Sequence, residues 1–434
     1  MKRFFLSIIF ILFTVSSIFS TVTVQLWHGY RGEEREAIEQ VARSFNREHR
    51  NIQVKLQAIP FDSLVLRLKA TVPINEGPDV FVYGHDRLGE WVENNIILSI
   101  ESFIDKDILD EYYANTVKAF QYLYSGAQWA LPMSFKNIAL YYNEDLIRQP
   151  PRNMSEIIEV SKRFTVPTHG AIGRYGFIYE TGNFYYHAMW VQGFGGRIFR
   201  RIGSSKDGFP ILLPLLYSEP MIKASEYVKN NIVDEGIVPL TPSGTQIAQL
   251  FNTGNAMFVV NGQWFRGEID ERIQYGLADL PIIDEVNRRA VPFLTVEGIY
   301  MSACVRNQEA AIKVIKYFTS EAMGRVFAEV GKQTPANKGA YRYGSIRRDR
   351  IAQTFRDVAV RAVSIPNFPE MALIWDPVSV GLHSIFGGAD SDMVWKGQQI
   401  QVMKSIEESK KSPGMYRQLS YDYNQITGPV SIRD

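Results

Sequence analysis

Residues 77–87 read Gly77-Pro78-Asp79-Val80-Phe81-Val82-Tyr83-Gly84-His85-Asp86-Arg87. The turn pair Gly77-Pro78 precedes a short apolar run rich in β-branched and aromatic residues, which is typical of a buried strand. The run ends at Tyr83, so the carboxyl end of this strand carries the polar side chains of Asp86 and Arg87. Because open α/β sheets bind ligands at that edge, we expect the segment to form part of a binding or active site.

The residues before this segment predict an α/β sheet. Alternating apolar and polar residues at 22–26 and 52–56 indicate two further strands, and apolar residues three to four apart at 33–47 and 64–70 indicate amphipathic helices. Strand, helix, strand, helix, strand implies parallel strands joined by right-handed crossovers. Trp27 then lies near the carboxyl end of the first strand.

Two long extended segments, at 129–143 and 291–303, predict that the chain crosses twice between two lobes. Their length and mixed polarity fit strands that pass from one domain to another, and 434 residues are too many for one ordinary core. Two crossings make each lobe discontinuous. Beyond the second crossing, the apolar spacing at 310–318, 321–330 and 392–408 predicts a helical C-terminal region.

The first twenty residues are typical of a secretory signal peptide. Met1-Lys2-Arg3 is basic, 4–15 is almost wholly apolar, and small residues occur in 16–20. The apolar run is shorter than the roughly 20 residues that a membrane-spanning helix needs. We therefore expect 1–20 to be a signal peptide and the protein to be periplasmic or otherwise extracytoplasmic. An uncleaved N-terminal anchor is the alternative, and it places the rest of the chain on the same side of the membrane.

Composition and motifs narrow the classes of function. The formal charge is +1, so the chain offers no electrostatic argument for binding nucleic acid. The sole cysteine, Cys304, cannot form an internal disulfide, and the six histidines are not spaced as zinc ligands. No Gly-x-Ser-x-Gly elbow or Walker loop occurs, so we expect no catalytic residue, metal or cofactor. A glycosidase needs only two carboxylates brought together by the fold, and this alternative stays open.

Aromatic residues recur beside polar side chains at the ends of the expected elements. They are Trp27, Tyr83, Trp264 and Trp375, and their polar neighbours include Asp86, Arg87, Gln263 and Asp376. Aromatic planes bury the C–H face of a sugar, while carboxylate, guanidinium and amide groups bind its hydroxyls. Any single aromatic residue could instead close a hydrophobic core. Their grouping favours a carbohydrate site.

The chain resembles the extracytoplasmic solute-binding proteins of carbohydrate ABC importers, most closely those that bind maltose and maltodextrins. The resemblance runs from about Val22 to about Ser409. Its strongest motifs are Gly77-Pro78-Asp79 with His85-Asp86-Arg87, Phe251-Asn252-Thr253-Gly254 with Asn261-Gly262-Gln263-Trp264, and Pro366-Asn367-Phe368-Pro369-Glu370-Met371 with Trp375.

The resemblance implies an α/β periplasmic-binding-protein fold of type II. Its two discontinuous lobes would be joined by hinge strands and followed by a helical C-terminus. The expected N-lobe comprises 21–135 plus 298–338 and the C-lobe 136–297 plus 339–409, which leaves 410–434 as a C-terminal extension. Lobes of such proteins close around their ligand by a hinge motion. The implied protein is a monomer that binds an oligosaccharide between its lobes and delivers it to ABC permease subunits in the membrane, without catalysis.

The ligand-binding residues expected from the aromatic pattern and the resemblance together are Trp27, Tyr30, Arg31, Tyr83, Asp86, Arg87, Lys136, Asn183, Tyr185, Tyr186, Trp264, Trp375 and Asp376. Four positions depart from the family's maltose binders. Lys136 stands where those proteins have a ligand-binding glutamate, Asn183 falls near another, Asp376 replaces a stacking tyrosine and Ser379 replaces an arginine. These departures put maltose itself in doubt. They also leave open an anionic sugar or a ligand of the glycerol-phosphate type, which Lys136 would attract.

Overall fold

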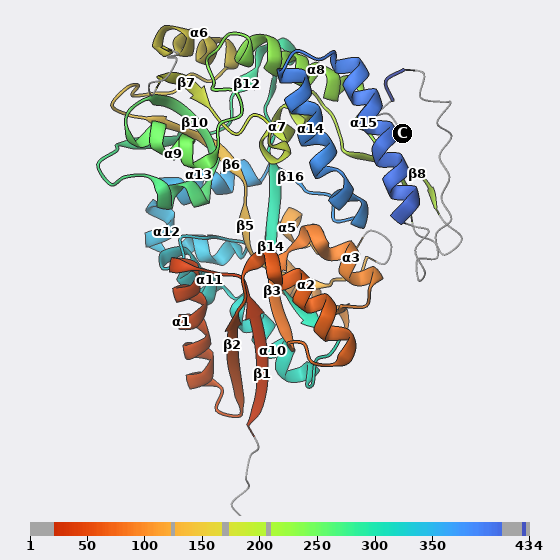
Figure 1. Cartoon of the computed structure of the whole chain (residues 1–434). Helices are drawn as coiled ribbons and strands as arrows, with labels where there is room; N and C mark the ends of the chain where they lie inside the picture. Colours follow the sequence, from red (N-terminus) through yellow and green to blue (C-terminus); the bar gives the residue numbers. More distant parts are fainter. Residues whose placement is uncertain (1–20, 123–125, 167–172, 205–209, 410–427, 431–434) are drawn as a thin grey trace, which may run out of the picture.

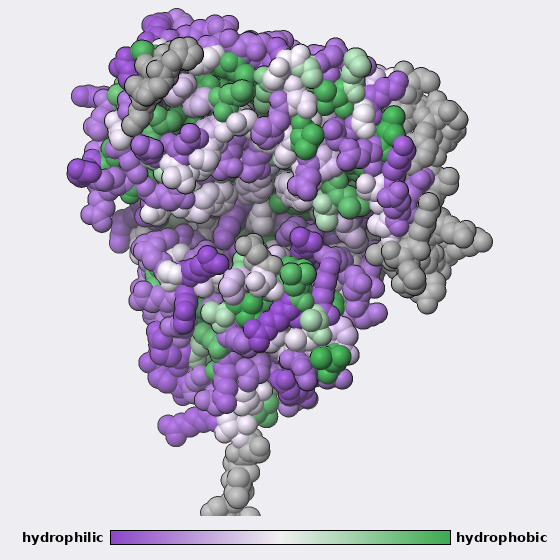
Figure 2. Space-filling model, in the orientation of Figure 1, coloured by the Kyte–Doolittle hydropathy of each residue, from purple (hydrophilic) through white to green (hydrophobic). Residues whose placement is uncertain are grey.

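The chain folds around two β-sheets, one in the lower and one in the upper part of the view in Figure 1. The computed structural model describes residues 21–122, 126–166, 173–204, 210–409 and 428–430. The expected signal peptide and most of the expected C-terminal extension lie outside the described residues. The face shown in Figure 2 is hollowed between the two parts.

The first sheet has the order β15-β5-β14-β3-β1-β2, with β4 and β16 added to β14. Its strands are β1 (Val22–His28), β2 (Ile52–Ala58), β3 (Val80–Gly84), β4 (Ile97–Leu98), β5 (Ala130–Lys136), β14 (Phe293–Ser302), β15 (Thr334–Pro335) and β16 (Val363–Ser364). β1 lies parallel to both β2 and β3, with Leu26 opposite Val80. The predicted parallel arrangement is confirmed. All five residues of β3 are buried, as expected of a central strand without polar alternation.

Amphipathic helices cover this sheet. They are α1 (Gly32–Glu48), α2 (Phe61–Thr71), α10 (Gln308–Phe318) and α11 (Glu321–Glu329). In α1 the buried residues include Ala37, Val41 and Phe45, so the apolar stripe read from the sequence faces the core. Gly77 is required before β3, because a Cβ atom there would lie 2.8 Å from a methyl carbon of Val72 and 2.9 Å from the Cys304 sulfur.

The second sheet has the order β11-β6-β10-β7. Its strands are β6 (Ile138–Asn143), β7 (Tyr175–Ile178), β10 (Ala256–Gly262) and β11 (Tyr275–Ala278), and its helices include α6 (Met154–Phe164), α7 (Phe184–Gly193), α8 (Glu219–Val228) and α9 (Gly244–Asn252). Leu140 of β6 and Phe258 of β10 belong to a hydrophobic core separate from that of the first sheet. Because the core of the first sheet is separate from the clusters around the second sheet, the chain has two lobes.

Three connections join the lobes. β5 ends at Lys136 in the first sheet and β6 begins at Ile138 in the second, so the chain changes sheet at the buried residue Asn137. It returns through β14, which pairs antiparallel with β5 and runs from the upper part back into the first sheet (Figure 1). α13 (Arg350–Ala359) then lies against strands of both sheets before β16 pairs with β14. The two expected crossing segments are thus β5–β6 and β14, while the expected residue boundaries of the lobes stay predictions.

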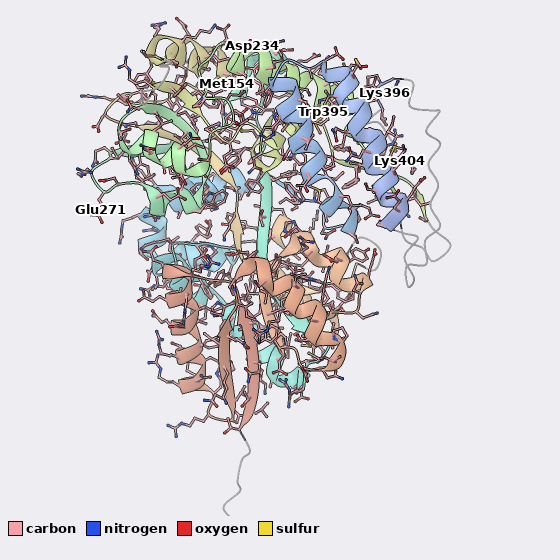
Figure 3. The ribbon with its side chains drawn as sticks, in the orientation of Figure 1. Met154, Asp234, Glu271, Trp395, Lys396 and Lys404 are labelled. Carbon is pink, nitrogen blue, oxygen red and sulfur yellow. The ribbon has the colours of Figure 1, made fainter. Side chains whose placement is uncertain are left out.

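The described chain is helical toward its C-terminal end. α14 (Trp375–Phe386) and α15 (Ser391–Ser409) pack closely because Gly381 leaves room for the Trp395 ring, which would lie 2.8 Å from a Cβ atom at that position. Trp395 is fully buried, whereas Lys404 on the same helix is exposed (Figure 3). Within the described ranges, each helix is too short or too polar to span a membrane.

Several short elements complete the fold. They are α3 (Leu88–Glu93), α4 (Lys106–Leu109), α5 (Ala114–Ala119), α12 (Gly344–Arg348), β8 (Phe199–Ser204), β9 (Pro210–Pro214), β12 (Ile282–Ile283) and β13 (Arg288–Arg289). Two 3-10 helices, η2 (His85–Arg87) and η5 (Gln263–Glu268), carry predicted site residues.

Candidate ligand-binding site

A partly buried network of charges lies where the lobes meet. The Lys136 Nζ atom, at the end of β5, is 3.0 Å from Glu297 Oε1 of β14 and 3.4 Å from Glu34 Oε1 of α1. Glu297 Oε2 accepts hydrogen bonds from the Tyr30 hydroxyl at 3.1 Å and the Ser134 hydroxyl at 3.0 Å. Each oxygen of the buried Glu297 carboxylate therefore has a partner.

This network keeps Lys136 charged. Burial acts to lower the pKa of Lys136, but the carboxylates of Glu297 and Glu34 outweigh it, so the pKa lies above its ordinary value. Burial raises the pKa of the Glu34 carboxyl; Lys136 lowers this pKa and Glu297 raises it. One ammonium thus faces two carboxylates.

Two pockets open onto this network. The first, which we call the inner pocket, has a volume of about 260 Å³ and is lined by Gly29, Tyr30, Glu34, Phe61, Gly84, Asp86, Lys136, Thr295 and Glu297. The second, the outer pocket, has a volume of about 440 Å³ and shares Glu34 and Lys136 with the first. Arg31 and Trp264 also line the outer pocket, and the Trp264 side chain is 41% exposed. Five of the predicted residues therefore meet here: Tyr30, Arg31, Asp86, Lys136 and Trp264.

Two more predicted residues lie beside these pockets. The Tyr185 ring centroid is 5.9 Å from that of Trp264, and the Tyr185 hydroxyl accepts a hydrogen bond from Thr295 at 3.5 Å. Burial raises the pKa of Tyr185 to about 12, so its hydroxyl keeps its proton. Tyr186 is buried behind it and donates a hydrogen bond to the Asn261 side chain at 3.0 Å.

The side chains of two predicted residues, Trp27 and Arg87, contact other protein groups. Trp27 is 4% exposed, and the Arg67 guanidinium lies 4.8 Å from its ring centroid. Arg87 donates to Glu90 at 3.0 Å, and Glu90 also pairs with Lys69. The Arg87 guanidinium is therefore held beside α3, the helix that follows it.

The remaining predicted residues lie in the second lobe. Asn183 caps α7 by accepting the Tyr185 backbone N–H, and its amide donates to Glu180 at 2.9 Å. Trp375 packs edge to face against Phe184 at 5.6 Å, while Asp376 is exposed in the first turn of α14. None of these three lines the inner or the outer pocket.

Tyr83 lies one layer behind the inner pocket. It is 7% exposed and stacks on Phe61 with ring centroids 4.3 Å apart and planes 17° apart. Phe61 is the ring that lines the pocket. Sequence reasoning missed Phe61, Glu34 and Glu297. Glu297 had a usable signal, since it is the one charged residue in a mostly apolar strand. Nothing in the sequence distinguished Phe61 from the other aromatic residues.

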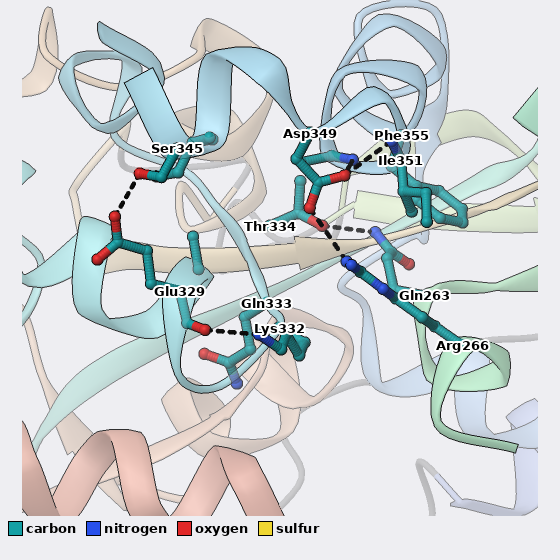
Figure 4. Close-up of a pocket in the computed structure, with 13 residues that line it drawn as sticks. Gln263, Arg266, Glu329, Lys332, Gln333, Thr334, Ser345, Asp349, Ile351 and Phe355 are labelled. Atoms are coloured by element: carbon teal, nitrogen blue, oxygen red, sulfur yellow. Dashed lines mark hydrogen bonds and ion pairs between the residues drawn. The ribbon is translucent and has the colours of Figure 1, made fainter. Parts of the chain in front are cut away.

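A third pocket, with a volume of about 260 Å³, adjoins the outer pocket and contains contacts of η5 with β15 of the first sheet and with Asp349, the N-cap of α13 (Figure 4). Arg266 pairs with Asp349 at 3.1 Å, and Gln263 Nε2 donates to the Thr334 hydroxyl at 3.0 Å. Gln263 Oε1 also accepts the backbone N–H of Asn137 at 3.2 Å. Within the described part of the chain, no three His, Cys, Asp or Glu side chains are placed to hold a metal ion.

The family model of bacterial extracellular solute-binding proteins matches residues 31–325. The chain belongs to this family. A maltotriose-binding protein of Pyrococcus abyssi is 25% identical over 88% of this chain and 82% of its own length. A maltooligosaccharide ABC transporter solute-binding lipoprotein of Streptococcus pneumoniae (strain ATCC BAA-255 / R6) is 22% identical over 91% of this chain and 90% of its own length.

A solved structure shares the fold of this family member. It is a cyclo/maltodextrin-binding protein complexed with maltotetraose, with a TM-score of 0.76 and 24% identity over 90% of this chain and 98% of the other. The match confirms the predicted two-lobed α/β fold.

Proposed function

We propose that this protein binds a neutral oligosaccharide at the junction of its lobes and delivers it to an ABC importer, without catalysis. The observation that carries the proposal is the network of Lys136, Glu297 and Glu34, which opens into the inner pocket beside the Phe61 ring. Such a site offers both donors and acceptors for hydroxyls and an apolar surface for a sugar ring. The oligosaccharides named for the relatives support this class of ligand.

The charges of the site disfavour an anionic ligand. Lys136 was the reason to consider an acidic sugar or a glycerol phosphate, yet its ammonium is already paired with two carboxylates. An anion in the inner pocket would also meet Asp86. Because like charges at close range repel, neutral sugars fit this pocket better than acidic ones.

The partner we propose is a membrane permease of the ABC type, which would recognise the closed form of a monomeric binding protein. A ligand shifts the balance between open and closed lobes only through its differential affinity for the two forms. Residues from both lobes surround the junction: Lys136 and Glu34 come from the first sheet and its helix, while Trp264 and Tyr185 come from the second lobe.

Thermal unfolding tests the proposal. Maltotriose, maltotetraose and galactooligosaccharides are titrated against the protein, with digalacturonic acid as the acidic control. A neutral oligosaccharide that binds should raise stability by about 2.7 kcal/mol at a concentration 100 times its Kd, with a change in tryptophan fluorescence. No shift across a broad panel of neutral glycans, or a shift with digalacturonic acid alone, would overturn the proposal. Release of reducing ends over hours would identify a glycosidase.

A further inference from the structure

The Phe61 ring is held in place from behind by a stack of aromatic residues. Phe61 is the first residue of α2 and its ring packs on Tyr83 with centroids 4.3 Å apart. Tyr83 in turn packs edge to face on Trp91 at 5.0 Å, and Trp91 is fully buried. The ring that lines the inner pocket is therefore anchored in the core of the first lobe.

Two glycines shape the walls of the inner pocket. A Cβ atom at Gly29 would lie 2.3 Å from Phe61 Cδ2, so the 29–30 loop meets the edge of the ring at this point only because residue 29 has no side chain. A Cβ atom at Gly84 would lie 2.5 Å from Asp86 Oδ1, so the carboxylate occupies that space. Asp86 makes no hydrogen bond or ion pair with any residue that the structure describes. A carboxylate without a protein donor is available to accept hydroxyls from a ligand.

We propose that Phe61 is the stacking platform for one sugar ring, and that Tyr83 is a positioning residue that holds it. This inference rests on the proposed function. Asp86 accepts hydroxyls of the stacked ring on one side, and the Lys136 network binds them on the other. The volume of about 260 Å³ lies below the range of about 300–1,000 Å³ typical of drug-sized ligands, so the inner pocket takes one ring. The rest of the oligosaccharide extends past Trp264 in the outer pocket.

Isothermal titration of maltotriose against the full chain and its variants tests this role. Phe61→Ala and Phe61→Leu should each weaken binding about tenfold or more, which corresponds to about 1.4 kcal/mol. Phe61→Trp, which keeps an aromatic platform, should bind far more tightly than either. Leu66→Ala is the matched control, because Leu66 is 71% exposed on the same helix and should leave the Kd unchanged.

A double-mutant cycle separates positioning from a direct contact. Tyr83→Leu should weaken binding in the wild-type background but add nothing in the Phe61→Leu background, because Tyr83 acts through the ring. Additive losses would overturn the positioning role.

Two other outcomes separate this inference from the proposed function. If the Phe61→Leu variant folds and binds maltotriose as tightly as wild type, Phe61 is not the stacking platform, while the proposed function stays intact. Wild-type protein that binds no neutral oligosaccharide would overturn both.

Discussion

Glu297 organises the site at the scale of single residues. It is buried inside β14, accepts hydrogen bonds from Tyr30 and Ser134, and pairs with Lys136. Leaving a buried charge without its partner is costly, because the interior solvates it poorly. Because Lys136 supplies the cation for the buried Glu297 carboxylate, it contributes to the stability of the fold as well as being a candidate for ligand binding.

Lys136→Met should lower the free energy of unfolding by about 3 kcal/mol, because it leaves the buried Glu297 carboxylate without its cation. Lys136→Met combined with Glu297→Gln should recover part of this loss. Urea denaturation measures both. The matched control is Lys162→Met, which removes the exposed pair with Glu235 and should cost no more than about 1 kcal/mol. Equal losses at Lys136 and Lys162 would contradict this account of the network.

At the scale of elements, η5 joins the second lobe to the first. Gln263 donates to the Thr334 hydroxyl and the Phe135 carbonyl, at 3.0 and 3.3 Å, and accepts the Asn137 backbone N–H. One side chain thus contacts β5, β15 and the residue at which the chain changes sheet. Three hydrogen bonds at one point fix the position of η5, and with it the position of Trp264.

Gln263→Ala should destabilise the protein by about 1–3 kcal/mol, because it leaves buried donors and acceptors at the lobe junction unsatisfied. It should also weaken oligosaccharide binding, since Trp264 loses its support. The midpoint of urea unfolding and the Kd for maltotriose measure the two effects. Gln40→Ala, at an exposed position on α1, should change stability by no more than about 0.5 kcal/mol. The same midpoint for both variants would show that η5 is held by other contacts.

At the scale of the whole molecule, buried histidines couple stability to pH. Burial and the nearby Arg35 lower the pKa of His28 to about 4, and burial alone lowers the pKa of His187 to about 3, from ordinary values of 6.5. His85 is buried in one neutral tautomer, accepting the Val296 N–H and donating to the Ile365 carbonyl, and its pKa is also lowered. The folded protein therefore disfavours the protonated histidines.

For this reason the folded state should become less stable as the pH is lowered. The unfolded chain binds protons at histidine below about pH 6.5, while folded His28 and His187 do so only near pH 4 and 3. Their contribution is fully present above pH 6.5 and is lost as the pH falls toward 3. Measurements of Tm between pH 7 and 4 should show this decline, and His187→Asn should reduce its slope. An unchanged slope in the variant would contradict the assignment.

Local patterns were enough to predict much of the fold. Alternation and apolar stripes between residues 22 and 83 predicted β1, α1, β2, α2 and β3, because period and turn residues specify such elements through neighbours in the chain. The long extended segments predicted the crossings for the same reason. Tyr30, Arg31, Asp86, Lys136 and Trp264 were predicted site residues, and the structure places them around two adjoining pockets.

What the sequence by itself determined is the class of the fold, the two crossings and the kind of chemistry at strand ends. Only the tertiary structure decided which side chains share a pocket. Glu34, Lys136 and Glu297 are more than 100 residues apart in the chain, and their pairing depends on how α1, β5 and β14 pack. Likewise Phe61 rather than Tyr83 lines the inner pocket, because Phe61, the first residue of α2, packs on the Tyr83 ring near the end of β3. Such contacts between distant segments leave no periodic signal in the sequence.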